Sequence, residues 1–270
     1  MCPHARFMGV LYPLCRYLSD SLISQAVVGL KEPASRSKIP TFFMPESQIK
    51  SKERVAERGE VFTAAREVNA MLDLVKQETE RIDSRFLEPA CGTGNFLVEI
   101  LRRKLDVIWQ NNTQRYGRKM DHEEIDRQTV QAVCSIYGID IMPDNVEECR
   151  LRLLEIIRDW YPHAHLGRTL EGELLRTLEY VLACNILWGD ALTLCEPERP
   201  DRPIVFAEWS FVGEGKVKRR DYTLDMLLKN QPIEEANLFS DLGDEAFIPT
   251  PCKEYKPVKY LKLYTQDVAQ

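Results

Sequence analysis

The residues from Glu88 to Asn95 combine a carboxylate, two glycines and an amide, and they are the part of the chain best suited to chemistry. Gly92 and Gly94 have no Cβ and can adopt positive φ, so the backbone there can approach a bound molecule closely. Asn95, or Thr93 beside it, can cap the helix that follows and leave its free N–H groups facing the same space. This combination is typical of a strand-to-helix turn that holds a small ligand.

The charge and spacing of this turn restrict which ligand it can hold. Glu88 would repel a pyrophosphate but would attract an ammonium or sulfonium group. Leu97 occupies the place of the third glycine in a G-x-G-x-x-G dinucleotide motif, and the absence of a following Gly-Lys-Ser/Thr excludes a P-loop. We therefore expect a cationic, adenosine-bearing ligand, of which S-adenosylmethionine is the simplest. The alternative is a tight β-to-α turn that binds nothing.

Two further carboxylates follow predicted strands. Asp140 lies near the end of an apolar strand predicted at 135–141, and Asp190 ends a strand predicted to start at residue 185. The carboxyl ends of parallel strands meet at the ligand crevice of an open α/β sheet, where a carboxylate can accept hydrogen bonds from hydroxyl groups. The alternative for Asp140 is a helix cap, a role that we assign to Asp144, and the alternative for Asp190 is a solvated loop acid.

Four segments, in order along the chain, resemble motifs of the adenine-N6 DNA methyltransferases of restriction-modification systems. Residues 87–96 match that family's first motif almost letter for letter. The other segments are Gly-Glu-Val-Phe-Thr at 59–63, Tyr-Gly-Ile-Asp-Ile at 137–141 and Asn-Ile-Leu-Trp-Gly-Asp-Ala at 185–191. Together they span about half of the chain, and their order argues against coincidence.

The resemblance implies an α/β fold with a doubly wound, mostly parallel sheet of the S-adenosylmethionine-dependent methyltransferase type, whose substrate half is abbreviated here. It implies that the 59–63 segment folds over the methionine end of the cofactor, that Asp140 holds the ribose hydroxyls, and that Asp190 accepts a hydrogen bond from the adenine amino group. The cofactor-binding residues that it implies are Phe62, Thr63, Glu88, Pro89, Ala90, Gly92, Gly94, Asn95, Phe96, Asp140, Ile141, Asp190 and Ala191.

One motif of that family is missing. Its members carry Asn or Asp, then Pro-Pro, then an aromatic at the end of the fourth strand, where oxygens accept the hydrogens of the adenine amine and the aromatic stacks on the flipped base. This chain has no Pro-Pro, and at the expected place it has Glu208, Trp209, Ser210 and Phe211. Glu208 could accept a hydrogen bond and Trp209 or Phe211 could stack on a base, so these four are the candidate catalytic residues. The alternative is an ordinary core strand.

These motifs lead to two predicted functions. The first is an S-adenosylmethionine-dependent methyltransferase that modifies the N6 amine of adenine in DNA. The alternative is a non-catalytic S-adenosylmethionine-binding subunit or regulator that has lost the catalytic motif. A third interpretation, methylation of RNA or protein, needs the same pocket with a different wall. Because the stretch after Phe211 has no room for a base-reading domain, we expect a companion or specificity subunit as a partner.

The charge of the chain bears on DNA binding. There are 36 Lys and Arg against 42 Asp and Glu, which gives a net charge of −6 and excludes the electrostatic footprint of an autonomous duplex binder. The dense basic cluster Lys216, Lys218, Arg219 and Arg220 follows the candidate catalytic strand and is predicted to contact DNA phosphates. The alternative is a solvated loop.

The composition fits one domain with extensions. With 44% hydrophobic residues among 270, the chain can build one substantial core. We expect an N-terminal extension at 1–43, a methyltransferase-like domain at 44–270 and a polar insertion near 106–132. The eight cysteines form no C-x-x-C pair, which predicts reduced thiols and a cytoplasmic location, with no metal site. No apolar run reaches the length of about 20 residues that a membrane span needs.

Periodicity and turn residues predict the order of the elements. We expect helices at 64–77, 96–105, 144–160, 170–182 and 222–229, and strands at 86–88, 135–141, 185 onward, 204–211 and 258–264. Strands that alternate with helices imply a parallel sheet, in which 204–211 would be the fourth strand.

Overall fold

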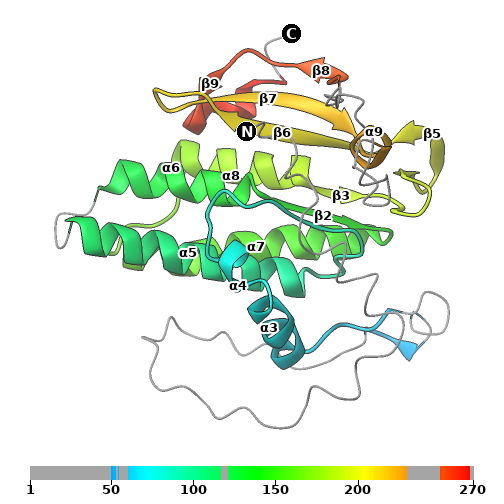
Figure 1. Cartoon of the computed structure of the whole chain (residues 1–270), viewed down its shortest axis with the longest axis horizontal. Helices are drawn as coiled ribbons and strands as arrows, with labels where there is room; N and C mark the ends of the chain where they lie inside the picture. The colour runs from blue at the N-terminus through cyan, green and yellow to red at the C-terminus, as the bar shows by residue number, and fades with distance from the viewer. Residues whose placement is uncertain (1–49, 53, 55–59, 117–120, 230–249, 268–270) are drawn as a thin grey trace, which may run out of the picture.

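The computed structural model describes residues 50–52, 54, 60–116, 121–229 and 250–267, so the predicted extension at 1–43 lies outside the described residues. The fold is mixed α/β. Figure 1 shows a small parallel sheet with helices on both sides and an antiparallel sheet across the top of the molecule.

Three short strands form the parallel sheet. They are β1 (Phe86–Glu88), β2 (Ile136–Asp140) and β3 (Ile186–Trp188), hydrogen-bonded in the order β1-β2-β3. The strands predicted at 86–88 and 135–141 are therefore confirmed, the second with slightly shorter ends. Every residue of β1 and β2 is buried, as expected for parallel strands that are covered on both faces.

Helices cover both faces of this sheet. α5 (Asn95–Tyr116) and α7 (Pro143–Ala164) lie against one face, and α8 (Gly172–Asn185) contacts β2 and β3 from the other (Figure 1). Gly138 in β2 lets α5 come close, because a Cβ there would lie 2.9 Å from Cδ1 of Leu97. The helices predicted at 144–160 and 170–182 are confirmed as α7 and α8, with shifted ends.

Two predicted helices have different bounds. The helix predicted at 64–77 is broken into α3 (Ala65–Asp73) and α4 (Lys76–Thr79), and the helix predicted at 96–105 continues to Tyr116 as α5. The described part of the predicted insertion near 106–132 therefore consists of the second half of α5 and most of α6 (His122–Val133). α6 packs against α5 and α8 and buries Ile125 and Val130 completely, so this segment belongs to the core.

The strand predicted at 204–211 is present, but the prediction that it is the fourth strand of the parallel sheet is wrong. β6 (Val205–Phe211) pairs antiparallel with β7 (Lys216–Thr223) in a separate sheet. The connecting turn contains Gly213 and Gly215, both at positive φ, so the chain turns straight back and pairs with its own neighbour. β8 (Lys253–Glu254) and β9 (Val258–Lys259) pair with the other side of β7.

The remaining elements lie outside these two sheets or at their ends. β4 (Cys195–Glu196) and β5 (Arg199–Pro203) form a small antiparallel pair after β3. α9 (Leu224–Lys229) begins later than the helix predicted at 222–229, because Tyr222 belongs to β7. The strand predicted at 258–264 is right only for β9, and its remainder is part of a 3-10 helix, η2 (Tyr260–Thr265), that packs on α8.

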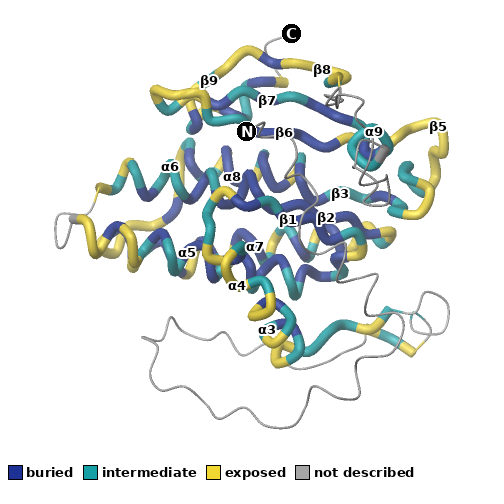
Figure 2. Tube along the Cα trace, viewed as in Figure 1, coloured by how far each residue is buried: buried dark blue, intermediate teal, exposed yellow. Residues whose placement is uncertain are grey.

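Burial is concentrated along the parallel sheet, the helix sides that face it and β6 (Figure 2). Lys104 of α5 is also completely buried. Its Nζ donates to the carbonyl oxygens of Arg81 at 3.1 Å, Ile82 at 3.0 Å and Ser84 at 2.5 Å, and to Oγ of Ser135 at 2.8 Å. Burial lowers the pKa of Lys104 to about 7. One ammonium group thus joins the loop before β1 to the start of β2.

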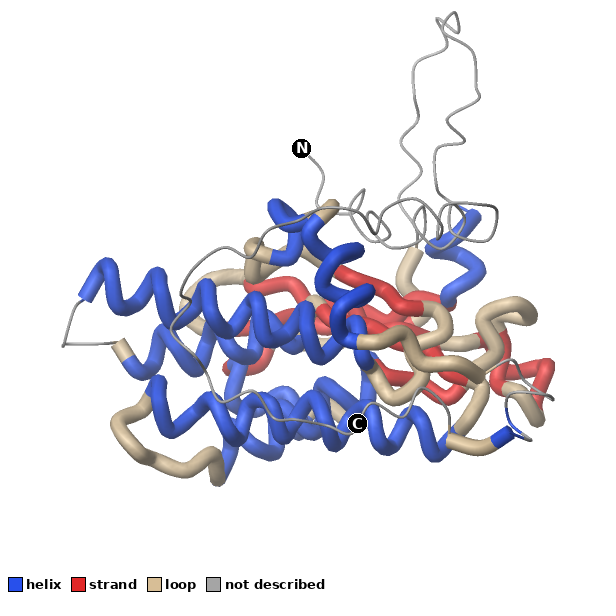
Figure 3. The backbone as a smooth tube through the Cα atoms, turned by 90° about the horizontal axis from the view of Figure 1, so that it is seen from below, coloured by secondary structure: helices blue, strands red, loops and turns tan. Residues whose placement is uncertain are grey.

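The helices extend well beyond the strands. The 22 residues of α5 span about 33 Å, whereas the 3 residues of β1 span about 10 Å. Seen from below, the long helices accordingly run side by side while the strands gather toward the other end of the molecule (Figure 3). None of the helices in the described ranges combines the length and the apolar character needed to cross a membrane.

Candidate functional site

The glycine turn after β1 has the backbone that its sequence predicts. Gly92 has φ of +52° and Gly94 has φ of +88°. A Cβ at Gly94 would lie 2.5 Å from Sγ of Cys149 in α7, and a Cβ at Gly92 would lie 3.0 Å from the ring of Phe62. Both positions therefore need glycine, for the backbone conformation and for the close packing.

Asp140 ties this turn to the start of α7. Its Oδ2 accepts from the backbone N–H of Gly92 at 2.8 Å, and its Oδ1 accepts from the backbone N–H of Met142 at 2.8 Å and from Nδ2 of Asn145 at 3.1 Å. The carboxylate therefore has a structural role at the helix start, which is the alternative that we raised for it. Each carboxylate oxygen has more than one lone pair, so a ligand hydroxyl could still share it.

The assignment of the α7 cap to Asp144 is wrong. The N-cap residue is Met142, which makes no side-chain cap, and its backbone N–H donates to Oδ1 of Asp140. Asp144 instead accepts from Nη1 of Arg54 at 2.7 Å and from Nζ of Lys50 at 3.1 Å. The hydrogen bond from Arg54, together with Lys50, lowers the pKa of Asp144 to about 2. Asp144 therefore anchors the segment before the site.

The segment predicted to fold over the site does lie against the turn, although Gly59 is outside the described residues. Glu60 Oε1 accepts from Nδ2 of Asn145 at 2.6 Å, and the carbonyl oxygen of Thr63 accepts from Nδ2 of Asn95 at 2.9 Å. With the ring of Phe62 over Gly92, these contacts fix residues 60–63 above the turn. No sequence pattern pointed to Asn145, whose importance depends on its position between the carboxylates of Glu60 and Asp140.

Glu88 ends β1 beside the turn and is 7% exposed. Burial raises its pKa to about 7, against the opposing effect of a hydrogen bond from the backbone of Ala90. No ion pair joins Glu88 to a cation within the described ranges. A buried carboxylate without a counterion is a suitable partner for an ammonium or sulfonium group, because ion pairing would offset the cost of its burial.

Asp190 follows β3 at the same edge of the sheet. Its Oδ1 accepts from the backbone N–H of Leu192 at 2.8 Å, and its own N–H donates to the carbonyl of Cys195 at 2.9 Å. The N–H of Gly189 donates to the carbonyl of Asp140 at 3.0 Å, which places the two strand ends side by side. Apolar surface is exposed beside both acids, with Ile141 at 36% and Leu192 at 94%.

The predicted cofactor residues thus gather at one edge. Direct contacts join the turn, Asp140 and residues 60–63, and Glu88 and Asp190 end the neighbouring strands on either side of β2. The flanking residues of the prediction are half-buried or exposed, with Phe96 in the first turn of α5 and the others in the loops of this edge: Pro89, Ala90, Ile141 and Ala191.

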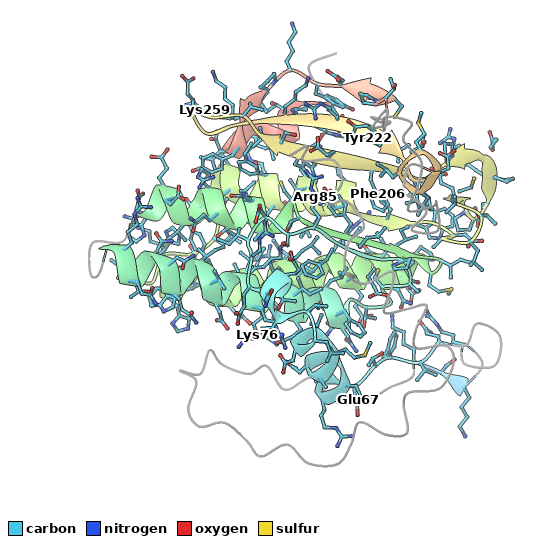
Figure 4. The ribbon with its side chains drawn as sticks, in the orientation of Figure 1. Glu67, Lys76, Arg85, Phe206, Tyr222 and Lys259 are labelled. Atoms are coloured by element: carbon cyan, nitrogen blue, oxygen red, sulfur yellow. The ribbon has the colours of Figure 1, made fainter. Side chains whose placement is uncertain are left out.

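The four candidate catalytic residues are not part of this edge. Glu208 is 2% exposed and accepts from Nη2 of Arg85 at 2.7 Å, from Nη1 of Arg220 at 3.2 Å and from Oγ of Ser210 at 2.9 Å. Arg85 directly precedes β1, so the pair lies at the amino end of that strand, whereas Glu88 is at its carboxyl end. The ion pair between Arg85 and Glu208 holds β6 against the start of β1, and Figure 4 labels Arg85 and, on β6, Phe206.

Trp209 and Phe211 are also directed away from the carboxyl edge of the parallel sheet. The indole N–H of Trp209, which is 4% exposed, donates to Oδ1 of Asn185 at 2.9 Å, and Asn185 directly precedes β3. Phe211 is half-buried and packs against the core. β6 starts beside Gly189, where a Cβ would lie 2.5 Å from Cδ1 of Ile204, and runs toward the amino ends. This geometry favours the core-strand alternative for Glu208, Trp209, Ser210 and Phe211.

The basic cluster lies on strand β7, and each of its four cations pairs with a carboxylate. The pairs are Lys216 with Glu214 at 3.2 Å, Lys218 with Glu254 at 2.7 Å, Arg219 with Asp221 at 2.6 Å and Arg220 with Glu208 at 3.2 Å. Because the cluster belongs to β7, the loop that we named as the alternative is not observed. A phosphate group would have to compete with these acids for every cation.

No family model, curated protein or solved structure matches the chain. The family expected from the four segments therefore remains a prediction. The described residues contain no group of three or more His, Cys, Asp or Glu side chains that could hold a metal ion.

Proposed function

We propose that the carboxyl edge of β1, β2 and β3 binds S-adenosylmethionine. The observation that carries this proposal is the buried Glu88, which has no cation partner among the described residues and lies next to a turn whose two glycines are both at positive φ. Glu88 would attract the cationic end of the cofactor. Asp140 and Asp190, on the next two strands, would receive the ribose hydroxyls and the adenine amino group.

We also propose that the parallel sheet is the cofactor half of a doubly wound methyltransferase fold. The order β1-β2-β3, with α5 and α7 on one face and α8 on the other, supports the cofactor half of a doubly wound methyltransferase sheet. At the place in the sequence where a fourth parallel strand is expected, the chain forms the antiparallel β6–β7 hairpin. The difference from the expected fold therefore lies in the substrate half.

Between the two predicted functions, the geometry favours the cofactor-binding subunit. Transfer of a methyl group to adenine N6 requires acceptors for the amine hydrogens close to the sulfonium, because proximity and orientation supply most of the rate. Glu208 and Trp209 lie toward the opposite end of the strands and are bound to Arg85 and Asn185. We therefore propose that this chain holds the cofactor for a DNA adenine-N6 methylation system, and that a companion chain supplies the catalytic motif and the DNA contacts.

A binding titration followed by a transfer assay tests this proposal. The purified chain is titrated with methyl-labelled S-adenosylmethionine, and unmethylated DNA is then added. We expect saturable binding and no label on DNA. Label on DNA would restore the methyltransferase interpretation, and failure to bind would overturn the cofactor assignment altogether. An Asp190→Ala variant that binds as tightly as the original chain would remove Asp190 from the site.

A further inference from the structure

Arg152, on helix α7, contacts both residues that flank Gly94. Its Nη1 donates to the carbonyl oxygen of Thr93 at 2.6 Å, to Oγ1 of Thr93 at 2.9 Å and to Oδ1 of Asn95 at 2.8 Å. Thr93 is 5% exposed, so these contacts are made inside the protein. The guanidinium is planar with donors in fixed directions, so it holds the two sides of the turn in one relative position.

Asn95 continues this contact to the segment above the turn. Its Oδ1 accepts from Arg152, and its Nδ2 donates to the carbonyl oxygen of Thr63 at 2.9 Å. Because an amide oxygen only accepts and an amide nitrogen only donates, the bond from Arg152 fixes which side of the Asn95 amide faces Thr63. Arg152, Asn95 and Thr63 therefore form one continuous chain of hydrogen bonds from α7 to residues 60–63.

This chain of hydrogen bonds ends at one side of the proposed site. Thr63 and Asn95 meet at the turn that follows β1, which is also the strand that ends in Glu88. Asp190 follows β3, on the far side of β2. A ligand with its cation at Glu88 and its ring toward Asp190 would extend across the three strand ends. Because the contacts of Arg152 lie at the turn after β1, they would affect the part of the site that holds the cation.

We propose that Arg152 is a positioning residue that makes the site select ligands with a charged amino-acid chain over truncated nucleosides. This inference rests on the proposed function. Arg152 does not contact the ligand in this proposal. It holds Asn95, and through Asn95 it holds the Thr63 carbonyl and the neighbouring Phe62 over the amino-acid chain of the cofactor.

Arg150 provides a matched control for this role. It lies on the same helix, is half-buried like Arg152, and burial lowers the pKa of both guanidinium groups. Its Nε donates to the carbonyl oxygen of Ile186 at 3.0 Å and its Nη2 to that of Ala183 at 3.2 Å, with no link to the turn. Replacing Arg150 therefore removes a comparable buried donor without changing the position of Asn95.

The test compares two ligands on three forms of the full chain. The original chain, Arg152→Met and Arg150→Met are titrated with S-adenosylhomocysteine, which has the amino-acid chain, and with 5′-methylthioadenosine, which lacks it. We expect Arg152→Met to weaken S-adenosylhomocysteine binding about tenfold, equivalent to about 1.4 kcal/mol, and 5′-methylthioadenosine binding less than about threefold. Arg150→Met should leave the ratio of the two affinities unchanged, even where it lowers the thermal unfolding midpoint.

Two other binding results would overturn the proposal, and they can be told apart. Equal losses for both ligands, or no loss, would leave Arg152 with a structural role only. If the original chain binds neither ligand, the proposed function falls and this inference falls with it. If Arg152→Met does not fold, Asn95→Ala interrupts the same chain of hydrogen bonds, and the same selective loss is expected from it.

Discussion

The carboxyl edge of the parallel sheet and the β6–β7 hairpin are both rich in carboxylates, but the carboxylates have different partners. At the edge, Glu88 pairs with no cation in the described part of the chain, and Asp140 accepts from amide groups. In the hairpin, Glu208 lies between two arginines, and Asp221 binds Arg219 through both oxygens. An acid that is already neutralised by a cation has little capacity left for a charged ligand, so the partners decide which acids belong to a site.

The cations of the hairpin are likewise engaged by neighbouring side chains. Arg219 lies over the rings of Tyr180, Trp209 and Tyr255, with its Cζ 5.7, 5.6 and 4.5 Å from the ring centroids. Such a guanidinium stabilises the sheet through aromatic contacts as well as through its ion pairs. A cluster that resembles a phosphate-binding patch in the sequence is therefore largely engaged within the fold.

The largest expected effect comes from Glu208. Glu208→Ala leaves Arg85 and Arg220, whose side chains are only 15% and 22% exposed, without their shared carboxylate. Loss of one partner of a buried pair costs about 3 to 5 kcal/mol, and the partial exposure of the arginines favours the lower end. We expect the free energy of unfolding in urea to fall by about 3 kcal/mol.

Glu214→Ala is the matched control, because Glu214 pairs with Lys216 on the surface with 85% of its side chain exposed. It should leave the unfolding curve almost unchanged. Equal stability of the two variants would contradict the structural role assigned to the buried ion pairs of Glu208.

A methyl group at Gly94 should have the next largest effect. Gly94→Ala combines positive φ with a Cβ placed 2.5 Å from Sγ of Cys149, whereas Gly213→Ala has positive φ and open space around it. We expect the first substitution to destabilise by about 3 kcal/mol and the second by about 1 kcal/mol. Only the first should weaken S-adenosylhomocysteine binding in a titration, and a loss of binding in Gly213→Ala would show that the hairpin contributes to the site.

The pH dependence of ligand binding should identify Glu88. Burial raises its pKa to about 7 from an ordinary value of 4.5, so the free protein holds a proton that the unfolded chain releases between these values. Stability of the free protein should therefore fall as pH rises from about 4.5 to about 7. A cationic ligand needs the ionised form, so its affinity should rise with pH up to about 7, by at most about tenfold per pH unit, and then level off.

Glu88→Gln is expected to abolish this rise, because the amide does not titrate. Calorimetric titrations of S-adenosylmethionine at several pH values would measure it. An identical rise in the variant would assign the titration to another group.

The smallest effect is expected for Lys218. Lys218→Ala removes a surface ion pair to Glu254, and such pairs contribute little to stability. We expect an unchanged unfolding midpoint and no measurable effect on DNA binding, followed by fluorescence anisotropy at physiological salt. A marked loss of DNA affinity would mean that phosphates do displace Glu254.

The parts that the sequence predicted well depend on local interactions. The strand at 86–88, the turn and the start of α5 follow from an apolar run, two glycines and a helical pattern within a short stretch of chain. The direction of β6 could not be predicted in this way, because it depends on pairing with β7 and on contacts with residues that precede β1 and β3. The residues of a single strand do not show which other strand it will pair with.

The sequence indicated the acids at the carboxyl edge of the parallel sheet but not the residues that hold the turn and the neighbouring loops in place. Glu88, Asp140 and Asp190 ended recognisable strands, whereas Asn145 and Arg152 are ordinary members of an amphipathic helix until the fold brings them to the turn. At the start of α7, the sequence allows either Asp140 or Asp144 to accept hydrogen bonds from the helix start. The structure distinguishes them, because the N–H of Met142 donates to Asp140.

The buried ammonium of Lys104 gives this fold a built-in reporter of its own opening. An acylating reagent cannot reach Nζ while the carbonyl oxygens of residues 81, 82 and 84 surround it. Acylation of Lys104 would require its contacts with the loop before β1 and with Ser135 to open, whereas the exposed lysines should react at once. The rate of its modification, followed by mass spectrometry, would therefore measure how often this buried contact opens in an otherwise native molecule.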